Sequence, residues 1–185
     1  MEHEKDLIGY YALLTFAGLR PSEGARVQWQ DYSAKTNELY VRKGKTNARH
    51  LILEPVAQEW MKFHRENTAK DAPFISLKSL ANREKAIRMA VLNGEWIQDG
   101  LRHGFGTYYK ALTKSIAGVA DYMGNSPDIV KRHYARTIPK EECEAFWNLT
   151  PQVVTANKPE QSQTPVPSPD NPDETTAAIK TSDSP

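Results

Sequence analysis

The chain has 185 residues, of which 39% are hydrophobic and 25% are charged, and its formal net charge is +1. A chain of this size and composition can bury one hydrophobic core of ordinary domain size. Its single cysteine, Cys143, excludes an internal disulfide, and no apolar run is long enough for a membrane span or a secretory signal. We therefore expect a cytoplasmic protein without a membrane partner.

The charge is unevenly distributed along the chain. Residues 1–150 hold 22 basic and 18 acidic side chains, whereas residues 151–185 hold two lysines and five carboxylates. The second segment is rich in Pro, Ser, Thr and Asn and has almost no large apolar residues, so burial cannot offset the entropy lost on ordering it. We expect one folded domain over residues 1–150 and a disordered acidic tail over 151–185. The excess positive charge of the domain is too small to identify a nucleic-acid binder.

The N-terminal part of the domain is predicted to be helical. Apolar residues recur at helical spacing from Leu7 to Ala17, and Gly18 favours the end of that helix. Pro21 permits a second, short helix, because proline is tolerated in a first turn. Arg20 therefore lies just beyond the end of the first helix.

A β-hairpin is predicted next. Apolar residues alternate with polar ones at 39–41 and again at 51–53, on either side of the loop Gly44-Lys45-Thr46-Asn47. The rest of the domain is predicted to be helical, with one helix after Pro55 and others over residues 79–92, 100–112, 114–123, 127–134 and 139–148. The predicted fold class is mainly α with a small β-hairpin or sheet.

Basic residues and a tyrosine stand near the ends of these elements. Arg20 lies in Gly-Leu-Arg-Pro-Ser-Glu, Lys45 in the hairpin loop, Arg102 in Asp-Gly-Leu-Arg-His, and Tyr134 in His-Tyr. A guanidinium group is permanently charged and presents a planar fork of donors that fits phosphate oxygens. Two arginines with a lysine and a phenol therefore indicate phosphoryl chemistry, with a DNA phosphodiester as the expected substrate.

Two other interpretations of these residues find little support. Gly44-Lys45-Thr46 is similar to the end of a nucleotide-binding P-loop, but Leu39 stands where the earlier glycine is required, and the segment turns between two strands. The five histidines and the single cysteine show no paired metal-ligand spacing. We therefore expect neither a P-loop nor a metal site.

In their order, these motifs resemble those of the catalytic domain of tyrosine recombinases, which are also called phage-type integrases. The resemblance covers roughly residues 5–148. It rests on the first arginine box at 18–23, the lysine hairpin at 44–49, the second arginine box at 99–103, the Leu-Gly-His-Ser segment at 123–127, and the nucleophile in His133-Tyr134.

The resemblance implies site-specific DNA recombination or integration by transesterification, without a metal or another cofactor. Tyr134 would attack the phosphorus, form a 3′-phosphotyrosine and release a 5′ hydroxyl, to which Lys45 would give a proton. Arg20 and Arg102 would bind the nonbridging oxygens and stabilise the charge that develops in the transition state.

Several neighbouring residues would support this chemistry. Glu23 resembles the carboxylate that orients the first arginine. His103 and His133 would pack beside the site or move a proton. Lys43 and Arg42 are close enough in the sequence to take the role of the hairpin lysine.

Two positions depart from the family pattern. Asp99 replaces the histidine of His-x-x-Arg, and Asn125 replaces the histidine of Gly-His-Ser. Asparagine can still donate a hydrogen bond to a phosphate oxygen, whereas aspartate is repelled by phosphate unless the arginines offset its charge and let it act as a base. Two functions stay open: an active recombinase, and a degenerate domain that holds DNA or a partner without cleaving DNA.

The resemblance also implies partners and a place in the cell. We expect binding to double-stranded DNA, self-association on DNA through the C-terminal helix region, and a bacterial or phage protein associated with the nucleoid. Family members usually carry an N-terminal helical domain that closes around DNA. The sequence begins only a few residues before the first predicted helix, so we expect that domain to be absent.

Overall fold

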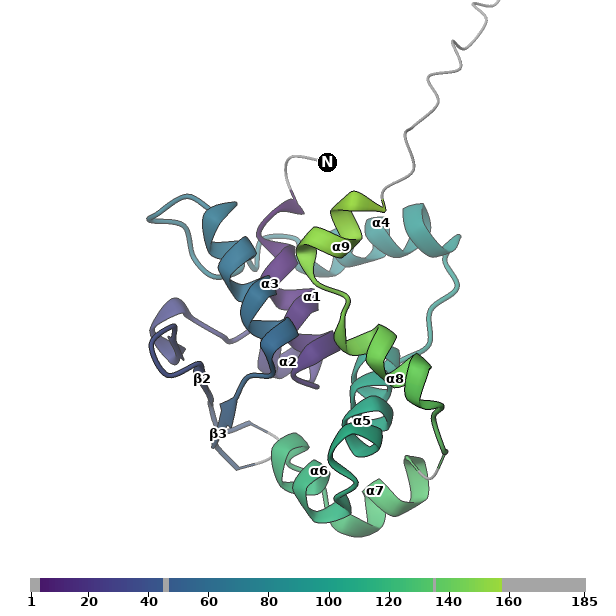
Figure 1. Ribbon diagram of the computed structural model, residues 1–185. Coiled ribbons are helices and arrows are strands. Elements are labelled where there is room, and N and C mark those ends of the chain that lie inside the picture. Colours follow the sequence, from purple (N-terminus) through teal and green to yellow (C-terminus); the bar gives the residue numbers. More distant parts are fainter. Residues whose placement is uncertain (1–3, 45–46, 135, 158–185) are drawn as a thin grey trace, which may run out of the picture.

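The computed structural model describes residues 4–44, 47–134 and 136–157. This part of the chain is mainly helical and includes one three-stranded antiparallel sheet, which confirms the predicted fold class (Figure 1). The hairpin lysine, Lys45, lies outside the described residues, as do residues 158–185 of the predicted tail. Within the described ranges, no helix has both the length and the apolar character that a membrane span requires.

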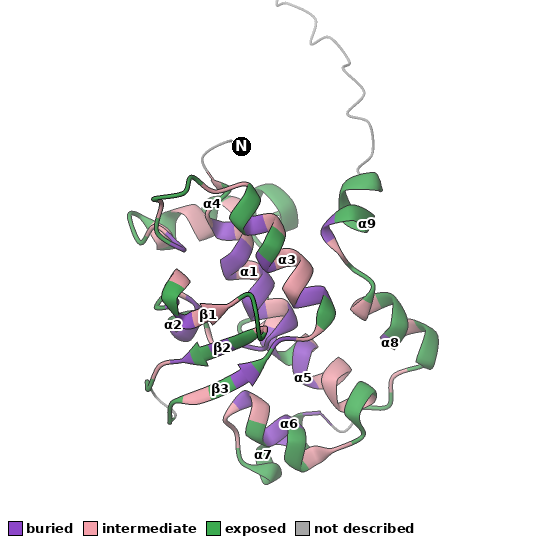
Figure 2. Ribbon diagram, turned by 60° about the vertical axis from the view of Figure 1, so that its left-hand side comes forward, coloured by how far each residue is buried: buried purple, intermediate pink, exposed green. Residues whose placement is uncertain are grey.

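Helix α1, Leu7–Phe16, runs through the centre of the molecule and is buried along most of its length (Figure 2). It is apolar on nearly all sides, as expected for a core helix, and packs against α3 and α5. Gly18 follows it with φ of 61°, a left-handed conformation that suits glycine. A Cβ atom on Gly18 would also clash with the ring of Phe105. Glycine therefore lets the turn between α1 and α2, Pro21–Gly24, approach α5 closely.

The predicted hairpin is present and has an additional strand. Strands β1, Tyr32–Ser33, β2, Glu38–Val41, and β3, Arg49–Ile52, pair antiparallel in the order β1-β2-β3, and the 3-10 helix η2, Trp29–Asp31, precedes them. The inward-facing side chains are apolar and buried, namely Leu39, Val41 and Leu51. Their alternation with exposed residues is the pattern that predicted the strands.

Helices α3, Pro55–Glu66, and α4, Leu80–Leu92, differ in how they attach to the core. The amphipathic helix α3 buries one face against α1, whereas α4 has no buried residue. Arg83 anchors α4 by pairing with Glu4 and Asp6 near the N-terminus. Of the apolar residues of α4, Leu80 and Ile87 are partly buried against the core, whereas Val91 is 72% exposed, so the helix has only a weak core face.

The C-terminal half forms a second cluster of helices. These are α5, Gly100–Thr113, α6, Ile116–Met123, α7, Pro127–His133, α8, Lys140–Trp147, and α9, Pro151–Ala156. The side chains of Ser115 and Ser126 cap α6 and α7 by accepting hydrogen bonds from backbone N–H groups. Six buried side chains on α5, α6 and α7 and just after α7 pack together as an apolar core, namely Phe105, Val119, Ala120, Met123, Val130 and Tyr134.

Helix α9 occupies the start of the segment that was predicted to be disordered. The side chain of Thr150 caps this helix and Pro151 is buried, while the indole of Trp60 on α3 donates a hydrogen bond to the Leu149 oxygen at 2.7 Å. The folded domain therefore continues to Ala156, past the predicted boundary at residue 151. Six residues are too few for a periodic apolar pattern to reveal such a helix.

Candidate active site

The turn between α1 and α2 positions Arg20 beside Glu23. Arg20 is the N-cap of α2, and its backbone N–H donates to Glu23 Oε2 at 2.9 Å. Its guanidinium group donates to Oε1 of the same carboxylate at 3.2 Å. Glu23 is 4% exposed, whereas the Arg20 side chain is 23% exposed. The buried carboxylate thus holds an arginine that still reaches the surface.

Arg102 lies on α5 and is almost completely buried. Its guanidinium group donates to the backbone oxygen of Gly18, to that of Met123 at 2.8 Å, and to Asn125 Oδ1 at 3.1 Å. Burial, and then the nearby charge of Arg20, lower the pKa of Arg102 to about 10. The group still carries its charge at neutral pH, and its acceptors come from two parts of the chain, the turn after α1 and the end of α6 with the following loop.

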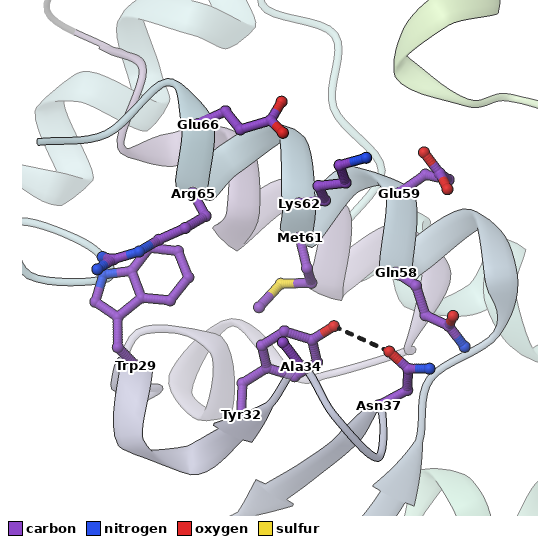
Figure 3. A pocket seen from close by; sticks show the side chains of 10 residues that line it. All are labelled: Trp29, Tyr32, Ala34, Asn37, Gln58, Glu59, Met61, Lys62, Arg65 and Glu66. Atoms are coloured by element: carbon purple, nitrogen blue, oxygen red, sulfur yellow. Dashed lines mark hydrogen bonds between the residues drawn. The ribbon is translucent and has the colours of Figure 1, made fainter. Parts of the chain in front are cut away.

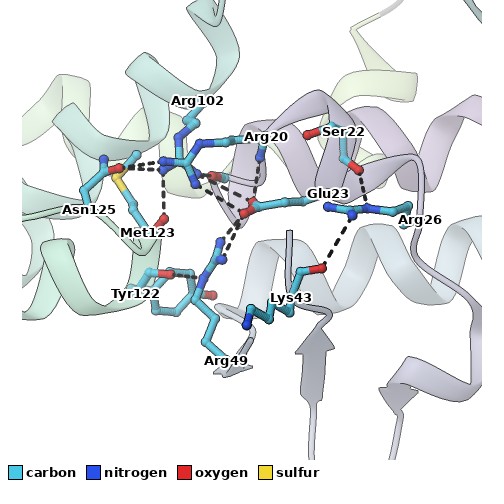
Figure 4. A network of polar contacts seen from close by, with 11 residues as sticks. Arg20, Ser22, Glu23, Arg26, Lys43, Arg49, Arg102, Tyr122, Met123 and Asn125 are labelled. Atoms are coloured by element: carbon cyan, nitrogen blue, oxygen red, sulfur yellow. Dashed lines mark hydrogen bonds and ion pairs between the residues drawn. The ribbon is translucent and has the colours of Figure 1, made fainter. Parts of the chain in front are cut away.

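Asn125, in the loop after α6, joins the two arginines that the sequence places far apart (Figure 4). Its Oδ1 accepts from Arg20 at 2.9 Å and from Arg102 at 3.1 Å. A guanidinium group can only donate, so the amide oxygen must face the arginines and the amide nitrogen is turned away from them. An amide nitrogen in this orientation can donate a hydrogen bond to another group.

Arg49 on β3 is a member of this network that the sequence interpretation gave no role. Its two terminal nitrogens donate to the two oxygens of Glu23, each at 3.1 Å, and its Nε donates to the Tyr122 oxygen at 2.9 Å. One signal could have revealed it: in a strand, residue 49 shares a face with Leu51, which is buried. An arginine on the inward face of a strand needs a buried partner.

The network carries a surplus of positive charge. Three guanidinium groups, from Arg20, Arg49 and Arg102, surround the single carboxylate of Glu23 (Figure 4). Burial raises the pKa of Glu23, but the hydrogen bonds from Arg49 and from the Arg20 backbone outweigh burial and bring that pKa to about 2. Glu23 is therefore ionised at neutral pH, and the four groups have a net charge of about +2. Such a site favours an anion.

Tyr134 follows α7 directly and is 3% exposed. Its ring covers Gly106 on α5, where an added Cβ would lie 2.7 Å from the tyrosine Cε1 and Cζ atoms. Burial raises the pKa of Tyr134, and the charges of Arg102 and Arg20 oppose that rise without cancelling it. The phenol is therefore protonated at neutral pH and needs a base before it can act as a nucleophile.

Three titratable groups lie near the tyrosine. The charge of Asp99, an exposed residue at the start of α5, contributes to the raised pKa of Tyr134. The ring centroid of His103 is 5.8 Å from that of Tyr134 and 6.1 Å from that of His133. Both histidines are exposed. The structure thus gathers Asp99, His103 and His133 on the side of α5 and α7 where the tyrosine lies.

The two basic residues considered as alternatives to the hairpin lysine differ in their contacts. Arg42 pairs with the buried carboxylate of Asp31, through Nε at 3.0 Å and a terminal nitrogen at 2.9 Å. Lys43 is exposed, and its backbone oxygen accepts from Arg26 at 3.5 Å. Arg42 is therefore engaged in an ion pair of its own, whereas the ammonium group of Lys43 lies at the surface.

A separate hollow of about 570 Å³ lies between η2, β1 and α3 (Figure 3). In it the guanidinium group of Arg65 lies 4.6 Å from the centre of the Trp29 ring, and the hydroxyl of Tyr32 donates to Asn37 at 3.4 Å. None of the predicted site residues lines this hollow. In the described part of the chain, no group of three or more His, Cys, Asp or Glu residues could hold a metal ion.

No family model and no curated protein matches the chain. Solved structures with a similar fold do match it. XerA recombinase is similar with a TM-score of 0.57 and 13% sequence identity. XerH site-specific recombinase is similar in a post-cleavage complex with palindromic difH substrate, with a TM-score of 0.53 and 13% identity, and in a pre-cleavage complex with difH, with a TM-score of 0.52 and 15% identity.

The alignments differ in how much of each protein they cover. They include 85% of this chain with XerA, and 71% and 78% with the two XerH complexes. This chain spans 60% of the XerA chain and 42% and 46% of the XerH chains. At these identities the likeness concerns the fold. The chain has a fold like that of the catalytic domain of a tyrosine recombinase.

Proposed function

We propose that this chain breaks and rejoins DNA at specific sites, in integration or excision, through a 3′-phosphotyrosine on Tyr134. The observation that carries the proposal is the cluster in which Arg20 and Arg102 share Asn125. Tyr134 lies close enough to this cluster that the charges of both arginines lower its pKa, against the larger effect of burial. A net positive, partly buried site of this kind fits a phosphodiester, and a phenol is the nucleophile at hand. The similarity in fold to recombinases supports the same function.

The proposed chemistry is a reversible transesterification. Asp99 takes the proton of Tyr134, and the phenolate oxygen forms a bond to phosphorus while the bond from phosphorus to the 5′ oxygen breaks. Lys45 gives that 5′ oxygen a proton. The two arginines hold the nonbridging oxygens and stabilise the added charge of the pentavalent transition state. Attack by another 5′ hydroxyl on the phosphotyrosine reverses these steps and joins the strands.

The partner in this proposal is double-stranded DNA, which a bacterial or phage protein would meet in the bacterial nucleoid. The XerH structures that share the fold are complexes with difH substrates, which supports DNA as the ligand. We further propose self-association on DNA through α8 and α9. Leu149, Val153 and Val154 in this region are each at least 40% exposed and offer apolar surface to a second copy.

Covalent trapping tests the enzyme directly. We would incubate the protein with a pool of nicked duplexes of randomised sequence, isolate adducts that survive detergent, and identify the modified peptide by mass spectrometry. We expect the nucleotide on Tyr134 and no adduct with Tyr134→Phe. Tyr40→Phe, which changes an exposed tyrosine on β2, serves as the matched control and should form adduct normally. A nucleotide on another residue would contradict the assignment.

The arginines and the hairpin lysine give separate outcomes in the same assay. Arg20→Ala or Arg102→Ala should slow adduct formation by roughly 100-fold or more, because each removes donors to the transition state. Lys45→Ala should recover with a substrate whose 5′ leaving oxygen is replaced by sulfur, which leaves without a proton. Rescue of Lys43→Ala, with no rescue of Lys45→Ala, would move the general acid to Lys43.

The alternative function is a degenerate domain that binds DNA without cleaving it. Two observations favour keeping it: Asp99 places negative charge near the phosphate site, and Tyr134 is buried with a raised pKa. In that case DNA binding would weaken in Arg102→Ala, while the unchanged protein would form no adduct with any member of the pool.

A further inference from the structure

The carboxylate of Glu23 accepts hydrogen bonds from two different arginines, Arg20 and Arg49. Arg49 supplies two hydrogen bonds at 3.1 Å, and Arg20 supplies one from its backbone and one from its side chain. Arg102 stays at 3.9 Å, beyond a hydrogen bond. Arg49 and the Arg20 backbone thus supply three of these four hydrogen bonds, and the Arg20 guanidinium supplies the fourth and longest.

This division of donors matters because Glu23 competes with a bound anion. A carboxylate and a phosphate are recognised by the same guanidinium fork. If Arg49 were absent, the buried charge of Glu23 would need other donors, since an unpaired buried charge is costly. The nearest donors are the side chains of Arg20 and Arg102. Each donor that turned to Glu23 would be lost to the phosphate.

We propose that Arg49 is a positioning residue that satisfies Glu23 and thereby keeps Arg20 and Arg102 available for a phosphate. The inference rests on the proposed function in that the site takes a phosphodiester. It is a statement about anion binding and holds whether or not cleavage follows. Arg49 itself contacts the buried carboxylate, and only 11% of its side chain is exposed.

Arg49 also fixes the position of its own strand. Its Nε donates to the backbone oxygen of Tyr122, and the next residue, Met123, accepts from Arg102. One side chain therefore ties β3 to α2 and to the end of α6, close to Asn125. Because β3 belongs to the hairpin from which the general acid is expected, the same contact couples the position of the hairpin to the arginine pair.

The chain offers a matched control for Arg49. Arg42, which directly follows strand β2, also pairs through two nitrogens with a buried carboxylate, that of Asp31. Of the contacts in the described residues, none joins this pair to Arg20, Arg102 or Asn125. Loss of Arg42 should therefore cost comparable stability without changing the anion site.

The experiment is a double-mutant cycle with inorganic phosphate as the probe. Phosphate would be titrated into the unchanged protein, Arg49→Met, Glu23→Gln and the double variant, and followed through the ¹⁵N signals of the arginine side chains. Arg49→Met should weaken phosphate binding by about tenfold or more. Glu23→Gln should restore binding in the Arg49→Met background, with a gain at least about threefold larger than in the unchanged background.

Each outcome decides the inference. Equal effects of Glu23→Gln in both backgrounds would mean that Arg49 acts only through its charge, and would overturn the proposal. Unchanged affinity in Arg49→Met, or an equal loss in Arg42→Met, would overturn it as well. If Arg49→Met does not fold, Arg49→Lys replaces it, because lysine keeps the charge but cannot satisfy both oxygens. Covalent trapping on Tyr134 is scored separately, so a failure of cleavage leaves the phosphate result interpretable.

Discussion

At the scale of single residues, Asn125 gives the arginine pair an acceptor that does not titrate. Its oxygen binds Arg20 and Arg102 at the same time. A histidine there would change charge near neutral pH and would then repel both guanidinium groups. The asparagine therefore keeps the distance between the arginines independent of pH across the physiological range. An asparagine at this position therefore adds no titratable group to the arginine pair.

Gly106 sets the position of Tyr134, the proposed nucleophile, and a substitution there tests that role. Gly106→Ala places a methyl group within 2.7 Å of the Tyr134 ring, so the ring must move. We expect adduct formation to be lost and the free energy of unfolding to fall by about 1–3 kcal/mol. Chemical denaturation and covalent trapping measure the two effects.

Gly104 on the same helix provides the control for that substitution. No atom lies within 4 Å of a Cβ built at Gly104. Gly104→Ala should therefore gain helix propensity, by up to about 1 kcal/mol, and form adduct at the normal rate. Equal losses in both alanine variants would show that α5 tolerates no methyl group and that the tyrosine contact is not the cause.

Asp99→Asn separates the electrostatic effect of the carboxylate from its use as a base. Removing the negative charge should lower the pKa of Tyr134, because that charge disfavours the phenolate. If Asp99 is the base, adduct formation should nevertheless slow by about 100-fold. Tyrosine ¹³C NMR gives the pKa, and trapping gives the rate. Faster adduct formation in Asp99→Asn, or a large gain in Asp99→His, would show that the aspartate is only a hindrance.

At the scale of elements, segments marked by apolar periodicity, by alternation or by a proline could be predicted, whereas short segments without such a signal could not. The hairpin and the helices from α1 to α8 follow from apolar periodicity, proline and glycine. Strand β1, η2 and α9 have two, three and six residues and owe their conformation to tertiary packing.

The candidate site also contains residues that could be predicted from the sequence and one that could not. Motif order singled out Arg20, Arg102 and Asn125, and the structure brings these three together. Arg49 received no role because its partner, Glu23, is 26 residues away and the contact depends on how β3 packs against α2. No periodic pattern encodes a pairing between elements. The role of the hairpin lysine stays a prediction.

Two truncations test the contribution of α9. Ending the chain after Asn157 should leave the melting temperature nearly unchanged, because the removed residues are polar and acidic. Ending it after Asn148 removes the buried Pro151 and the Leu149 oxygen that accepts from Trp60, so the melting temperature should fall by several degrees. Thermal denaturation followed by circular dichroism compares the two. Equal melting temperatures would mean that α9 adds nothing to stability.

At the scale of the whole molecule, the site lies where two parts of the fold meet. One core cluster contains α1, the sheet and α3, and the other contains α5, α6 and α7. Arg20 and Glu23 belong to the first part, whereas Arg102, Asn125 and Tyr134 belong to the second. Contacts such as that of Arg102 with the Gly18 oxygen join the two. The relative position of the clusters therefore sets the geometry of the proposed phosphate site.

The stability of this assembly should depend on pH through buried groups in the first part. His64 on α3 is fully buried; its Nε2 contacts the Phe74 oxygen at 2.9 Å, and its ring stacks on Trp29. Burial lowers its pKa below the ordinary value of 6.5, although the hydrogen bond to the Phe74 oxygen opposes the shift. The unfolded chain therefore binds a proton more readily than the folded one, so the free energy of unfolding must fall as pH drops below about 6.5.

Glu23 adds a second pH range, at lower pH, in which the free energy of unfolding should fall. Its pKa is about 2 in the folded state against an ordinary value of 4.5, so its contribution is complete above 4.5 and is lost as pH falls toward 2. Urea denaturation between about pH 8 and about pH 3 should show both losses. His64→Gln should remove the loss near pH 6, whereas the same change at the exposed His50 should keep it. A stability that stays constant between about pH 8 and about pH 5 would show that His64 is protonated without cost in the folded protein.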